Sequence, residues 1–173
     1  YKKDFDWTLQ QVKNLKQSSS LLIANDAVEL FLLIQDNSAE DSLRVALQAY
    51  AKADLQLYQK KNEEALQSFL TILEKHKGKS IEDETLLKIA DIYYQKKDYL
   101  KALNYYQNIL DNHKEGIYID EALFFSAEIY RKHLLDNEKA KPLYEKMVLE
   151  HPDSLYYTES RKQYRTLRGD TTI

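Results

Sequence analysis

One short phrase recurs along this chain at intervals of 37 residues. Its three copies are Ala53-Asp54-Leu55, Ala90-Asp91-Ile92 and Ala127-Glu128-Ile129. A second alanine follows each copy, and an aromatic residue stands four positions after that alanine. These pairs are Ala65 with Phe69, Ala102 with Tyr106, and Ala140 with Tyr144. A fixed period of this size indicates a repeat protein, in which each repeat is one supersecondary unit that stacks on its neighbours.

Apolar residues recur with helical spacing over nearly the whole chain, and short polar breaks interrupt the pattern. The breaks fall at 17–20, 36–38, 60–62, 77–80, 96–98, 112–117, 136–137 and 152–154. They leave about nine helices of ordinary length. The 173 residues include only 3 glycines and 2 prolines, which favours helices over strands and turns. Ser80 with Asp83 predicts a helix start, and Gly169 predicts a helix end.

The repeats carry a known residue pattern. One copy reads Leu86-x2-Ile89-Ala90-x2-Tyr93, then Ala102-x3-Tyr106; the next reads Leu123-x2-Ser126-Ala127-x2-Tyr130, then Ala140-x3-Tyr144 and Pro152. Both resemble the tetratricopeptide repeat, although the later copy has one extra residue in its inner turn. The copy before them has Gln56 where the pattern has tyrosine. Small residues are needed where two helices cross closely, which gives the pattern a mechanical reason.

The resemblance implies an all-α fold, a right-handed superhelical solenoid of antiparallel helix pairs in one domain over residues 1–173. We expect a partial repeat at 4–16, an extra helix at 20–36, repeats at about 46–79, 83–116 and 120–153, and a capping helix at 155–168. The helix at 20–36 is apolar on nearly every face, so it is expected to be buried. The capping helix carries Arg161, Arg165 and Arg168 on one side, which predicts a solvated outer face.

Three short segments are similar to bacterial members of this family. His151-Pro152-Asp153-Ser154 resembles cell-envelope members, while Trp7 and residues 22–27 resemble long bacterial repeat proteins. The segment from Asp4 reads like the second helix of a repeat whose first helix is missing. From these features we expect the C-terminal part of a longer bacterial array, located in the periplasm or cell envelope rather than the cytoplasm.

Catalytic and metal chemistry find no support in the sequence. The chain has no cysteine, and no Ser/His/Asp set, HExxH motif or glycine-rich phosphate loop occurs. His76, His113 and His151 occupy equivalent places in successive repeats, about 8–10 Å apart if they follow the helix spacing, which is too far for one metal ion. They are expected at helix C-termini, where the helix dipole favours a cation. We therefore expect no enzyme activity, no metal and no cofactor.

The resemblance also implies a binding surface, because in this family the first helix of each repeat lines a concave groove. The matching positions are Tyr50, Asp54, Leu57, Leu87, Asp91, Tyr94, Phe124, Glu128 and Arg131. The middle position of each three is acidic, whereas members that clamp a terminal carboxylate have asparagine there. An acidic and aromatic groove favours a partner protein or peptide with basic and apolar side chains. The alternative is that these acids pair with neighbouring helices or keep the surface soluble.

The leading functional interpretation is a non-catalytic scaffold for protein–protein interaction. One alternative is a structural spacer in a bacterial cell-envelope assembly, such as an outer-membrane or secretion complex. Another is an accessory or regulatory region of a larger protein whose catalytic domain lies elsewhere. Nucleic acid is not an expected partner, because the formal net charge is −3. Membrane insertion is not expected either, because the most apolar stretch, 21–34, is short and contains polar residues.

Overall fold

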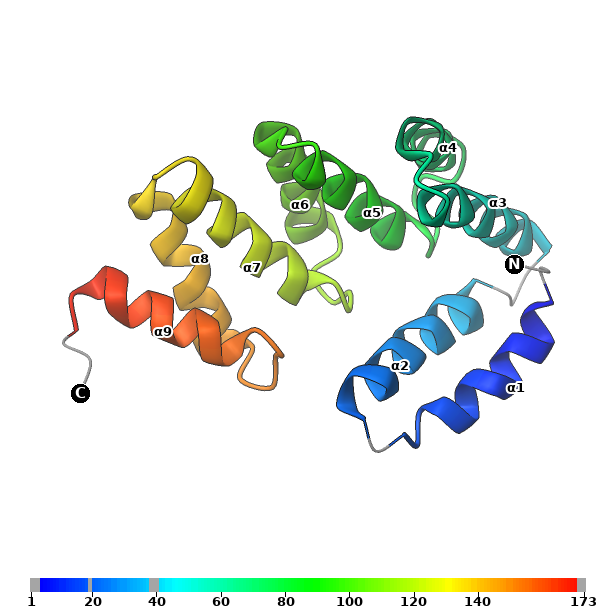
Figure 1. Ribbon diagram of the computed structural model, residues 1–173, viewed down its shortest axis with the longest axis horizontal. Coiled ribbons are helices and arrows are strands. Elements are labelled where there is room, and N and C mark those ends of the chain that lie inside the picture. Colours follow the sequence, from blue (N-terminus) through cyan, green and yellow to red (C-terminus); the bar gives the residue numbers. More distant parts are fainter. Residues whose placement is uncertain (1–3, 19, 38–40, 171–173) are drawn as a thin grey trace. The chain divides into compact units, whose positions relative to one another are not determined.

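The computed structural model describes residues 4–18, 20–37 and 41–170, which form nine α-helices and no β-strand (Figure 1). The helices are α1 (Phe5–Leu15), α2 (Leu21–Asp36), α3 (Asp41–Tyr58), α4 (Asn62–Lys75), α5 (Glu82–Gln95), α6 (Tyr99–Asn112), α7 (Ile119–Glu128), α8 (Asn137–Glu150) and α9 (Tyr157–Arg168). The predicted all-α class and helix number are confirmed. No helix of the described residues has both the length and the apolar character needed to cross a membrane.

The chain divides into two compact units, residues 1–85 and 86–173, and the division falls within α5. In unit 1, α1 packs on α2 and α3 packs on α4. Ala53 of α3 and Ala65 of α4 are fully buried, so the two helices can approach closely there. Beside them the rings of Tyr50 and Phe69 meet edge to face, with centroids 5.3 Å apart.

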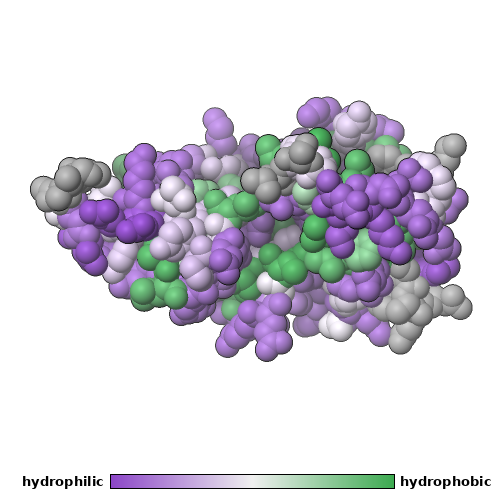
Figure 2. Space-filling view, turned by 90° about the horizontal axis from the view of Figure 1, so that it is seen from below, coloured by the Kyte–Doolittle hydropathy of each residue, from purple (hydrophilic) through white to green (hydrophobic). Residues whose placement is uncertain are grey.

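Helix α2 corrects one expectation from the sequence. Ala27 and Ile34 are buried, but Leu22, Ile23 and Leu30 are exposed, so the predicted burial of 20–36 is wrong for much of this helix. The sequence pattern shows which residues are apolar and cannot show how many faces find a neighbour. Hydrophobic side chains accordingly reach the surface among hydrophilic ones (Figure 2).

The predicted helix start at Ser80 is also wrong. Helix α5 begins at Glu82, and the Ser80 hydroxyl instead donates to Asn37 Oδ1 at 2.9 Å. The buried Asn37 side chain in turn donates to the Leu33 carbonyl at 2.9 Å. Ser80 therefore ties the end of α2 to the loop before α5, a contact between residues far apart in sequence.

Unit 2 repeats one packing scheme. Helix α7 packs on α6 and on α8, and α8 packs on α9. The alanines of the recurring pattern, Ala90, Ala102, Ala127 and Ala140, are fully buried, as are Tyr106 and Tyr144. The small positions of the pattern are therefore packing positions, as the repeat register predicts. His76, His113 and His151 stand at the C-caps of α4, α6 and α8, which confirms their predicted place at helix C-termini.

The turn inside each repeat holds a non-glycine residue in the left-handed region. Lys60, Lys97 and Leu135 have φ of +63°, +61° and +54°, and each immediately precedes the N-cap of the second helix. In unit 2 that N-cap is an aspartate, Asp98 or Asp136, whose side chain accepts a hydrogen bond from a backbone N–H three residues on.

The extra residue of the last repeat is absorbed by a change of helix type. Helix α7 continues as a π-helix over Ile129–His133, where the Leu134 N–H donates to the Ile129 carbonyl at 3.0 Å. A π-helix closes its hydrogen bonds one residue later than an α-helix, so it takes up one residue without breaking the pairing of α7 with α8.

Candidate partner-binding surface

The positions predicted for the groove come from the first helix of each repeat. Three lie on α3 in unit 1, and six lie on α5, α7 and the π-helix in unit 2. Spacing of four and then three residues places each set of three on one face of its helix. Tyr50, Leu87 and Glu128 are buried. The half-buried positions, which a partner could reach, are Asp54, Leu57, Asp91, Tyr94, Phe124 and Arg131.

Asp91 is held by the second helix of its own repeat. The hydroxyl of Tyr106, on α6, donates to Asp91 Oδ1 at 2.8 Å. Tyr106 is fully buried, and burial followed by the Asp91 charge raises the pKa of its hydroxyl. The tyrosine therefore stays a neutral donor and fixes the direction of the carboxylate.

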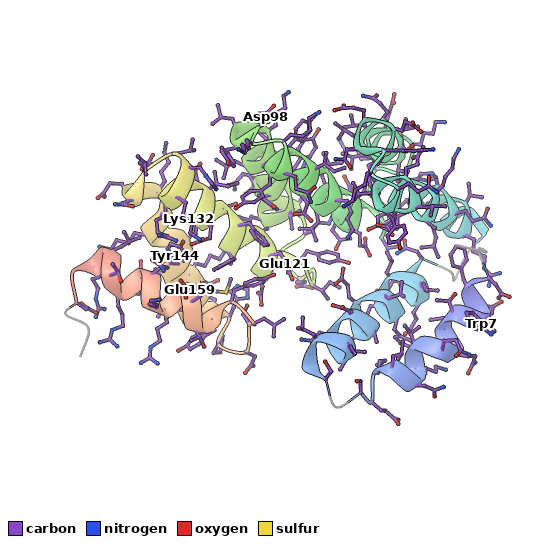
Figure 3. The ribbon with its side chains drawn as sticks, in the orientation of Figure 1. Trp7, Asp98, Glu121, Lys132, Tyr144 and Glu159 are labelled. Atoms are coloured by element: carbon purple, nitrogen blue, oxygen red, sulfur yellow. The ribbon has the colours of Figure 1, made fainter. Side chains whose placement is uncertain are left out.

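Glu128 occupies the equivalent place in the next repeat and has three side-chain partners. Its Oε1 accepts from Tyr144 on α8 and from Arg131 Nη2 at 2.9 Å, and its Oε2 pairs with Lys132. Figure 3 labels two of these partners, Lys132 near the end of the π-helix and Tyr144 on α8. Burial alone would raise the pKa of the Glu128 carboxyl, but the bonds from Lys132, Tyr144 and Arg131 outweigh it and hold that pKa below its usual value.

The copy in unit 1 lacks this arrangement. Phe69 stands where the other copies have tyrosine, so it has no hydroxyl to donate to Asp54. In this copy the Ser68 hydroxyl of α4 donates to Gln56 Oε1 of α3 at 2.8 Å. Gln56 is the same residue that breaks the tetratricopeptide pattern in the sequence.

The recurring acid thus has a structural role in both copies of unit 2. Asp91 and Glu128 each accept a hydrogen bond from a buried tyrosine of the neighbouring helix. Glu128 also pairs with two cations, Arg131 and Lys132. A partner therefore meets more cationic than anionic charge around Glu128.

Further aromatic side chains, outside the nine predicted positions, lie around Tyr94 and Phe124. Tyr94 meets the ring of Phe125 at 5.9 Å and that of Tyr99 at 5.8 Å, and Tyr99 stacks on His133 at 4.0 Å. Phe124 stacks on Tyr156 at 4.5 Å. The chain contains 14 tyrosines, but their pairing depends on contacts between helices, so no sequence signal identified them.

The described residues contain no group of three or more His, Cys, Asp or Glu side chains able to hold a metal ion. The interactions of this surface are instead ion pairs, hydrogen bonds and ring contacts. Such a surface offers charge and stacking to a partner, and in unit 2 Asp91, Glu128 and Arg131 are bonded by a tyrosine of the second helix.

Comparison with known proteins agrees with this geometry. Residues 84–115 and 121–154 match the family model of the tetratricopeptide repeat. They correspond to the helix pairs α5 with α6 and α7 with α8. No curated protein matches the chain.

A solved structure shares the fold. A tetratricopeptide repeat protein from Parabacteroides merdae superposes with a TM-score of 0.59 at 20% identity, over 96% of this chain and 60% of that one. The present chain therefore spans about three fifths of the protein it matches. The predicted solenoid fold is confirmed by this likeness. The predicted similarity to cell-envelope proteins, and the predicted place at the C-terminal end of a longer array, find no support in these comparisons.

Tetratricopeptide repeats typically mediate protein–protein interaction, through the extended surfaces that stacked helix pairs create. The predicted class of function, a protein-binding scaffold, agrees with the two matched repeats.

Proposed function

We propose that unit 2 is a non-catalytic scaffold that binds an extended segment of a partner protein along the exposed side of α5 and α7. The proposal rests on groove residues that a partner can reach and that the second helix of the same repeat holds in place. Asp91 and Arg131 are half-buried, and each is bonded by a buried tyrosine of the second helix. Side chains fixed in this way lose little conformational freedom on binding, which favours affinity.

The partner segment is expected to carry apolar and basic side chains. Tyr94 and Phe124 are half-buried, so each offers part of a ring to an apolar side chain or a cation. Asp91 supplies a half-buried carboxylate whose direction is fixed by the hydroxyl of Tyr106. Glu128 contributes little attraction for a cation, because Arg131 and Lys132 already pair with it.

The test uses binding of the purified chain to an array of peptides that differ in charge at constant apolar content. Asp91→Asn removes the charge and keeps an oxygen that accepts from Tyr106, so the fold should be retained. Asp111→Asn is the matched control, because Asp111 is exposed on α6, outside the predicted groove.

Peptides with Lys and Arg should bind more tightly than acidic ones, and their binding should weaken with salt because the pairs are partly exposed. Asp91→Asn should weaken the basic peptides several-fold, whereas Asp111→Asn should not. Equal binding by the parent and the Asp91→Asn chain would show that the partner does not use this face.

A further inference from the structure

Two helices of this chain carry opposite charges. Helix α2 has three acids, Asp26, Glu29 and Asp36, and no Lys, Arg or His. Helix α9 has four bases, Arg161, Lys162, Arg165 and Arg168, and Glu159 as its only acid. Helix α7 also has three acids and no base, but its Glu128 is buried and paired with Arg131 and Lys132, whereas Asp26 and Glu29 of α2 are exposed. The exposed acids of α2 and the bases of α9 are therefore complementary in charge.

The bases of α9 face away from its packed side. Tyr164 and Leu167 pack against the buried cluster that includes Tyr144 of α8. Arg161 and Arg165 are exposed, four residues apart, which places them about 6 Å apart along the helix axis. Within the described residues Arg161 has no ion-pair partner, and Arg165 lies 3.8 Å from Asp170.

The acids of α2 stand among exposed apolar side chains. Leu22 is 74% exposed and Ile23 is 48% exposed. Asp26 and Glu29 follow Leu22 at spacings of four and seven residues, so all three share one face of the helix. In the described part of the chain neither acid lies within ion-pair distance of a cation. Apolar side chains that gather at a surface, flanked by polar ones, mark interaction sites.

We propose that α9 of one copy of this chain docks on α2 of another copy. The guanidinium groups of Arg161 and Arg165 would pair with Asp26 and Glu29. The aliphatic stems of the arginines would cover the apolar side chains around Leu22, which long basic side chains do while their charged ends stay in water. The two surfaces differ, so the contact is heterologous, and each copy offers one surface of each kind.

The experiment measures the mass of the purified 173-residue chain by sedimentation velocity over a wide concentration range. Two reversed chains are compared with the parent, one with Arg161→Glu and Arg165→Glu, the other with Asp26→Arg and Glu29→Arg. Mass should rise with concentration for the parent, and each reversed chain should associate at least roughly tenfold more weakly. An equimolar mixture of the two reversed chains should associate again, because each then meets a surface of opposite charge.

The matched control changes two exposed lysines elsewhere, Lys77→Glu with Lys114→Glu, and should associate like the parent. Restored association in the mixture also shows that both reversed chains are folded. A parent that stays monomeric throughout overturns the proposal and assigns the α2 face to a different partner. The proposal is equally overturned if the mixture does not associate, or if the control loses association as fully as the reversed chains.

Discussion

Replacing Glu128 by glutamine tests whether the recurring acid holds the repeat together. The side chain is 5% exposed and joins three elements, since Tyr144 lies on α8 and Arg131 and Lys132 lie on the π-helix. Glutamine has nearly the same size, so the change leaves no cavity. It removes the negative charge and replaces one accepting oxygen by an amide that donates. At least one of the three donors then loses its acceptor.

The size of the effect follows from the partners. Hydrogen bonds to charged groups contribute about 1.5–3 kcal/mol each, and removing one partner of a fully buried ion pair costs about 3–5 kcal/mol. The side chain of Arg131 is 23% exposed and that of Lys132 is 51% exposed, so water can partly replace the lost carboxylate. We therefore expect Glu128→Gln to lower the free energy of unfolding by about 2–4 kcal/mol.

Urea unfolding followed by circular dichroism measures this loss. Glu115→Gln is the control, because Glu115 is exposed in the loop before α7, and its effect should stay below about 0.5 kcal/mol. Tyr144→Phe should cost about 1.5–3 kcal/mol, and the double change should cost less than the sum of the single ones, because both remove the same bond. A Glu128→Gln chain as stable as the control would refute the structural role of this acid.

The pH dependence supplies a second readout of the same network. The pKa of Glu128 is lower in the folded chain than its ordinary value, so the unfolded chain binds a proton first as the pH falls. The stabilisation is therefore complete above about pH 4.3 and is lost as the pH falls through the folded pKa. The Glu128→Gln chain should show a smaller loss of stability over this acidic range than the parent.

Four further substitutions test other parts of the fold by urea unfolding. Ala90→Leu and Ala127→Leu should each destabilise by about 1–3 kcal/mol, because both alanines are fully buried; unchanged midpoints for both would contradict the repeat register. Leu135→Gly should stabilise by about 0.5–1 kcal/mol, because Leu135 is exposed with φ of +54°; a loss of stability would show that this backbone is not strained. Burial, followed by a hydrogen bond and charge from Asp83, raises the pKa of Glu84 to about 10. The folded chain therefore keeps a proton that the unfolded chain releases above about pH 4.3. The free energy of unfolding should fall as the pH rises from about 4.3 to about 10. Glu84→Gln should remove this slope and raise stability at neutral pH; an unchanged slope between pH 5 and pH 9 would assign the effect to other groups.

Part of the candidate surface could be predicted from the sequence and part could not. The register of Ala53, Ala90 and Ala127 placed the first helices and the nine groove positions, because helical spacing alone fixes which residues share a face. It could not show that Glu128 is buried while Asp91 is half-exposed. The two acids look equivalent in sequence, and they differ because the π-helix after Glu128 brings Arg131 and Lys132 to its carboxylate.

The sequence by itself determined the repeat period, the number of helices, the small residues at helix crossings and the histidines at helix C-termini. These features depend on the order of residues within one or two helical turns, which the chain specifies locally. Only the tertiary structure decided that Tyr106 and Tyr144 donate to the recurring acids, that Ser80 bonds across to Asn37, and that α2 leaves apolar side chains exposed. Each of these depends on which side chains meet across two packed helices, and that is set by packing rather than by spacing along the chain.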